Sequence, residues 1–151
     1  MAGPVGLFPY LVVGDAKAAI DFYTKAFGAH EVARHSAPHT DKLMHVHMVI
    51  FGSALYFSDD FPEHVGGKSR TPHAIGGTPV TLHLQVEDAR AIWDSAMANG
   101  ATSVMPLADQ FWGDRYGKLL DPFGHEWSIG QTLKKLSDKE VEKAAETAFQ
   151  A

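Results

Sequence analysis

Two stretches of the chain repeat the same order of hydrophobic patterns. Residues 7–13 and 80–86 alternate in hydrophobicity with a period of two, which predicts strands. Each is followed by an aspartate typical of a helix N-cap, Asp15 or Asp88, and then by apolar residues at helical spacing. A glycine follows each helical pattern, where a C-cap commonly requires a positive φ. The sequence therefore predicts two copies of one strand–helix unit, about half a chain apart.

Three strand-like segments follow each predicted helix, so each half is predicted to be a β-α-β-β-β module. The segments are residues 31–35, 43–51 and 54–58 in the first half, and 102–106, 116–121 and 126–130 in the second. We expect a single domain with modules at residues 5–60 and 79–131. The linker, residues 61–78, is rich in Gly, Pro and Ser and is predicted to be a loop. A capping-box sequence beginning at Ser137 predicts a C-terminal helix over residues 137–150.

Composition narrows the classes of function. The formal net charge is −5 with neutral His, so the chain lacks the basic surface of a nucleic-acid-binding or membrane-surface protein. It has no Cys, which excludes disulfides and thiolate chemistry. No apolar stretch approaches the roughly 20 residues of a membrane span, and residues 1–15 carry no positive charge for a signal peptide. We expect a soluble cytoplasmic protein with neither nucleic acid nor membrane as partner.

Several local motifs resemble the vicinal oxygen chelate superfamily of glyoxalases, bleomycin-resistance proteins and extradiol dioxygenases. Residues 9–29 resemble its first strand and helix, and residues 113–129 resemble its last hairpin. The sequence Leu-Tyr-Phe-Ser-Asp-Asp at 55–60, combined with the motifs of that hairpin, resembles the PhnB-like branch. The resemblance covers about residues 5–131. It implies an α+β fold in which the two modules form a curved mixed sheet around a ligand chamber, and it implies a homodimer.

The resemblance also gives the positions at which enzymes of this superfamily hold a divalent metal, typically with His and Glu. The corresponding residues here are Phe8, Tyr56, Thr81 and Ser128, although the position of Tyr56 is uncertain by one residue. None is an ordinary first-choice ligand for a transition metal. We therefore favour a small-molecule-binding protein of the resistance type that works without a metal cofactor. The alternative is a lyase, isomerase or oxygenase.

Alternation along the strands predicts which side chains point into the implied chamber, away from the helices. The predicted lining is Phe8, Tyr10, His45, His47, Tyr56, Thr81, His83, Gln85, Glu126 and Ser128. Intervening apolar residues, such as Met44 and Val80, are predicted to pack on the helix layer. Aromatic walls with a few polar groups suit a small-molecule ligand.

Several of these residues have two interpretations. His45 and His47, with His83 and Glu126, form a relocated metal site if a divalent metal is bound, or hydrogen-bond to their neighbours. His83, with Glu126, is a candidate for acid–base catalysis or substrate contact, and His83 is equally consistent with a satisfied core histidine.

Two further candidates lie near the last hairpin. Arg115 is a candidate to bind a ligand carboxylate or phosphate, or to pair with Asp114 or Asp121. Trp112 is a candidate to stack on a planar ligand, or to pack in the core or at an interface.

Overall fold

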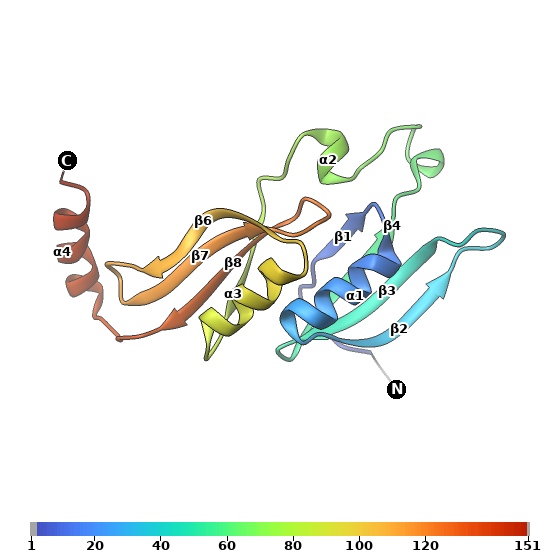
Figure 1. The fold of residues 1–151 in the computed structure, drawn as a ribbon. Coiled ribbons are helices and arrows are strands. Elements are labelled where there is room, and N and C mark those ends of the chain that lie inside the picture. Colours follow the sequence, from blue (N-terminus) through green and yellow to red (C-terminus); the bar gives the residue numbers. More distant parts are fainter. Residues whose placement is uncertain (1–2, 151) are drawn as a thin grey trace.

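The chain folds as two β-α-β-β-β modules followed by a separate C-terminal helix, as the sequence predicts (Figure 1). The structure is a computed structural model and describes residues 3–150. The first module contains β1 (Tyr10–Val13), α1 (Ala16–Phe27), β2 (His30–Ser36), β3 (Leu43–Ile50) and β4 (Ser53–Asp59). The second contains β5 (Thr81–Gln85), α3 (Ala89–Ala98), β6 (Thr102–Asp109), β7 (Asp114–Leu120) and β8 (Glu126–Thr132). The C-terminal helix is α4 (Asp138–Ala148).

Each module forms its own four-stranded mixed sheet, in the order β1-β4-β3-β2 or β5-β8-β7-β6. The first strand of each module pairs in parallel with the last, and the remaining pairs are antiparallel. Strands β1 and β5 therefore each lie at a sheet edge. Helices α1 and α3 lie side by side on one side of the two sheets (Figure 1), and their apolar faces join both modules into one core.

The two helices begin where the sequence predicts, because aspartate side chains cap them. Asp15 Oδ1 accepts a hydrogen bond from the Ala18 amide at 3.0 Å, and Asp88 Oδ1 accepts one from the Ala91 amide at 3.1 Å. Helix α1 ends at Gly28, whose φ of 69° is left-handed backbone that glycine adopts without steric cost.

One buried carboxylate connects the modules. Asp121, only 3% exposed, follows β7 and accepts hydrogen bonds from the Tyr23 hydroxyl of α1 at 2.6 Å and from Trp127 Nε1 of β8 at 2.9 Å. The backbone amides of Phe123 and His125 donate to its other oxygen. All of its acceptor sites are thus used by groups from both modules, which holds α1 against the β7–β8 turn.

The structure corrects some expected details. The linker contains a short 3-10 turn (Pro62–His64) and a four-residue helix, α2 (Pro72–Ile75), capped by the Thr71 side chain. Val80 and Met44 are exposed rather than packed on the helix layer. Val80 precedes the start of β5, and Met44 lies beside a register shift in the β2–β3 ladder that buries Leu43 instead.

Replacing Asp121 by Ala is expected to lower the free energy of unfolding by about 3 kcal/mol, because four buried donors lose their acceptor. Tyr23→Phe is expected to cost about 1 kcal/mol, since it removes one of these bonds. Urea unfolding measures both values, with the exposed Asp21→Asn as control, expected within about 0.5 kcal/mol of the parent. An Asp121→Ala protein as stable as the parent contradicts the role of this residue.

Candidate functional site

An aromatic and histidine-rich cluster covers the open face of the first sheet, opposite α1. Tyr56 on β4 lies at its centre, with ring centroids 5.4 Å from Phe8, 4.9 Å from His45 and 4.8 Å from His47. Tyr10 on β1 is directly opposite Tyr56 in the parallel ladder. The buried side chains of β3, such as Val46 and Met48, alternate with the two histidines, as period-two alternation predicts.

His45 carries the main polar interaction of this cluster. The Tyr10 hydroxyl lies 2.7 Å from His45 Nδ1, and a neutral His45 protonated on Nε2 accepts this hydrogen bond. Burial lowers the pKa of His45, and the neighbouring His35 and His47 lower it further by charge repulsion. Burial and the adjacent Tyr56 raise the pKa of Tyr10. Both shifts favour the neutral pair near pH 7.

A polar network covers the open face of the second sheet. Thr81 donates a hydrogen bond to Glu126, its neighbour in the β5–β8 ladder. His83 Nδ1 lies 2.7 Å from Ser128 Oγ, and His83 Nε2 lies 2.7 Å from Gln85 Oε1. Because the amide oxygen can only accept, a neutral His83 carries its proton on Nε2 and accepts at Nδ1 from Ser128. This network fixes the tautomer and the orientation of an exposed imidazole.

A glycine makes room for this network. Gly130 is opposite Gln85 in the ladder, and a Cβ built on it would lie 2.7 Å from Gln85 Oε1 and 2.8 Å from His83 Cε1. Ser128, 2% exposed, lies beneath the His83 ring. Small residues on β8 therefore let the longer side chains of β5 lie across the sheet.

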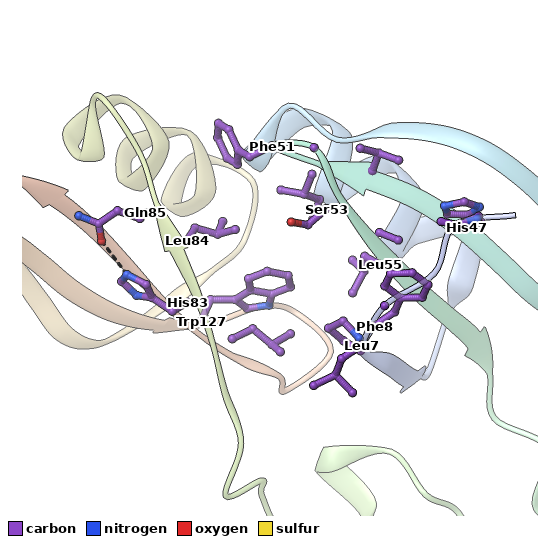
Figure 2. A pocket seen from close by; sticks show the side chains of 18 of the residues that line it. Leu7, Phe8, His47, Phe51, Ser53, Leu55, His83, Leu84, Gln85 and Trp127 are labelled. Carbon is purple, nitrogen blue, oxygen red and sulfur yellow. Dashed lines mark hydrogen bonds between the residues drawn. The ribbon is translucent and has the colours of Figure 1, made fainter.

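A groove of about 790 Å³ lies between the two modules, along β5 and the segment that precedes β1 (Figure 2). Its lining combines the segment before β1, the end of β3, the β3–β4 turn, the start of β4, the whole of β5 and the Trp127 indole. The labelled side chains are Leu7, Phe8, His47, Phe51, Ser53, Leu55, His83, Leu84, Gln85 and Trp127. The volume is in the range of small-molecule sites.

Comparison with known proteins supports the fold and places the chain in a family. The model of the glyoxalase/bleomycin resistance protein/dioxygenase superfamily matches residues 5–129. The chain belongs to this superfamily. The uncharacterized protein Rv0887c of Mycobacterium tuberculosis is 50% identical over 138 residues, which are 91% of this chain and 81% of that protein.

Two solved structures have a fold similar to that of this chain. Protein PA1353 from Pseudomonas aeruginosa has a TM-score of 0.67 and 26% identity, covering 85% of this chain and 98% of that one. TioX from Micromonospora sp. ML1 has a TM-score of 0.64 and 25% identity, covering 86% and 100%. In the described part of the chain, no helix is long and apolar enough to cross a membrane.

The positions at which superfamily enzymes are expected to hold a metal do not fit a divalent cation here. Phe8 and Tyr56 pack on each other, while the hydroxyls of Thr81 and Ser128 bond to Glu126 and His83. Hydroxyl and aromatic groups are poor transition-metal ligands.

The relocated set of metal ligands is divided between the sheets. His45 and His47 lie on the first sheet, and His83 and Glu126 lie on the second. Within residues 3–150 of one chain, no three His, Asp or Glu side chains gather as a metal site would require. A metal site at these four residues remains a prediction.

Five predicted site residues line the groove: Phe8, His47, Thr81, His83 and Gln85. Seven do not: Tyr10, His45, Tyr56, Trp112, Arg115, Glu126 and Ser128. Arg115 Nε donates to Asp109 Oδ1 at 2.8 Å rather than pairing with Asp114 or Asp121. Arg115 is opposite Gln131 in the β7–β8 ladder, and the Gln131 side chain accepts a hydrogen bond from the first amide of α3. The Arg115 side chain therefore points to the helix side of the sheet, opposite to Tyr116. Trp112 contacts the Tyr116 ring at 5.4 Å, and Tyr116 in turn stacks on His83 at 5.9 Å.

Sequence reasoning missed Phe51, Gly130 and Tyr116. Phe51 was expected at the end of a strand, whereas it forms the β3–β4 turn with Gly52. The dipeptide Phe-Gly is not a usual turn signal, so the hairpin was not evident. Tyr116 shares the period-two face of Lys118, and that signal was available in the sequence.

Replacing His35 by Gln is expected to raise the pKa of His45 toward the ordinary value near 6.5, because one source of repulsion is removed. NMR titration of the imidazole signals measures this shift, and His64→Gln in the linker is the control. The lowered pKa means that the unfolded chain binds more protons than the folded one. The His45 contribution to stability is therefore complete above about pH 6.5 and is lost as pH falls toward the lowered value. An unchanged His45 pKa in His35→Gln contradicts the assignment.

Proposed function

We propose that the chain is a small-molecule-binding protein of the sequestering, resistance type that needs no metal. The groove between the modules is the observation that carries the proposal. Burial against Phe8, Phe51 and the Trp127 indole supplies affinity, because apolar surface is removed from water. Polar groups such as His83 and Gln85 orient the ligand through hydrogen bonds.

We also propose that the protein acts as a cytoplasmic homodimer. The resemblance implies the dimer, and the segment before β1 supports it, since Val5 and Leu7 are 94% and 97% exposed. Adjacent exposed apolar side chains are typical of an interaction surface. The cytoplasmic location rests on the lack of Cys, which fits a reducing compartment.

A panel of aromatic and drug-like compounds is expected to raise the melting temperature of the metal-depleted protein, because ligands that bind the folded state stabilise it. Phe8→Ala is expected to weaken binding of a hit about tenfold, since it removes an aromatic wall of the groove. Phe149→Ala, an exposed aromatic at the end of α4, is the control.

Two results contradict the proposal: no stabilising compound in the whole panel, or binding that appears only after a metal is supplied. Analytical ultracentrifugation of the same samples tests the homodimer, and a monomer at micromolar concentration contradicts it.

A second candidate function is a PhnB-like enzyme that uses His83 for metal-free acid–base catalysis. The His83 network favours it, because Ser128 and Gln85 fix the tautomer of an exposed imidazole on the open face. Such positioning is what a general acid or base requires. Glu126 lies on the same face with Lys118 Nζ 3.7 Å away and is the second candidate for proton transfer.

If this enzyme reading holds, His83→Gln is expected to reduce conversion of a bound compound at least a hundredfold while leaving its affinity within a few-fold. Mass spectrometry of the ligand after incubation measures conversion, and metal analysis of the protein tests the relocated metal site. His39→Gln in the β2–β3 loop is the control. Conversion at the parental rate by His83→Gln excludes His83 as the proton-transfer group.

A further inference from the structure

The β3–β4 hairpin turns through a residue that this turn disfavours. Ile50 pairs with Ser53, and the two residues between them have φ angles of 48° for Phe51 and 81° for Gly52. Positive φ at both central positions defines the tight hairpin turn that favours Asn-Gly. A phenylalanine there is strained, because its Cβ crowds the backbone in left-handed conformation. Strain of this kind persists where the side chain serves a function.

The Phe51 side chain lies where a ligand would meet it. It is 56% exposed and lines the groove between the modules as well as a second hollow at the start of α3. Figure 2 shows Phe51 on one side of the groove and Leu7 and Phe8 on the other, with Trp127 between them. The strained turn thus exposes the Phe51 ring, which does not belong to the hydrophobic core of the described residues.

The groove lining lacks the side chains that are ordinarily charged near pH 7, apart from two histidines. Among the described residues that line it there is no Asp, Glu, Lys or Arg. Its polar groups are the side chains of Ser53, Thr81, Gln85 and two histidines. An ionised ligand would leave water without gaining a counter-charge, which is costly, whereas a neutral ligand loses little. The lining therefore favours uncharged molecules, although the protein as a whole is acidic.

We propose that Phe51 is a ligand-binding residue retained against backbone strain, and that the groove selects uncharged, flat aromatic molecules. The proposal rests on the proposed binding function and adds the ligand class and a contact residue. It also explains why the turn is Phe-Gly rather than Asn-Gly, which the same hairpin accommodates without strain.

Three naphthalene probes of matched shape test the ligand class: naphthalene-2-carboxamide, naphthalene-2-carboxylate and 2-naphthylmethylamine. They are neutral, anionic and cationic at pH 7.5, and calorimetry on the protein in its native oligomeric state measures their affinities. The carboxamide is expected to bind at least tenfold more tightly than either ion. Equal or tighter binding of an ion overturns the charge argument.

Two variants test the role of Phe51. Phe51→Asn is expected to raise the melting temperature by about 2–8 °C, because the strain is removed, and to weaken carboxamide binding at least fivefold. Phe51→Ala is expected to lose the same affinity without gaining that stability, since its backbone stays strained. Phe149→Ala is expected to change neither quantity. Parental affinity in Phe51→Asn, or the absence of a stability gain, overturns the proposal.

The outcomes also separate this proposal from the binding function itself. If compounds of the broad panel bind but no naphthalene probe does, the ligand class is wrong and the binding function stands. If neither panel nor probes bind, both fail.

Discussion

The buried carboxylate of Asp121 is the constraint on which the arrangement of the modules depends. A carboxylate removed from water is tolerated only when its oxygens accept enough hydrogen bonds. Here three donors come from the second module and one, the Tyr23 hydroxyl, comes from α1, so separating α1 from the β7–β8 turn would leave the carboxylate one donor short. His125 adds a second connection, because its Nε2 lies 2.8 Å from the Val12 carbonyl oxygen on β1. These bonds connect the two modules between which the groove lies.

The first backbone amide of α1 and that of α3 donate to different types of side chain. The first amide of α1, on Ala16, donates to Asp59 Oδ1 at 2.8 Å, while that of α3, on Ala89, donates to Gln131 Oε1 at 3.0 Å. Both acceptors lie at the end of the last strand of their module. A carboxylate and an amide serve equally, since only one acceptor oxygen is needed. The backbone plan is thus kept in both halves while side chains differ, and the open faces differ most.

The sequence alone was sufficient for the strands and helices of the two modules, for the C-terminal helix and for most side-chain directions, but not for α2 in the linker. Caps at Asp15 and Asp88, together with period-two alternation, predict the modules and place His45, His47 and His83 on the open faces. It was not sufficient for the contact between the modules at Asp121, because a carboxylate's partner in another module has no local signature. The Phe51 turn was missed for a related reason, since a strained residue contradicts the propensity rules by which turns are recognised.

On the open face of the second sheet, the His83 network occupies one of the positions at which superfamily enzymes are expected to hold a metal. Ser128 stands where superfamily enzymes are expected to carry a metal ligand, and His83 occupies the space above it at 2.7 Å. A longer carboxylate at position 128 would compete with the His83 imidazole for the same volume. Gly130 is the one glycine among the described residues of β8, and the space left by its missing Cβ is already used by His83 and Gln85. Restoring one ligand would therefore disturb the network without completing a metal site. The proposed binding therefore rests on the groove beside the network rather than on a metal above it.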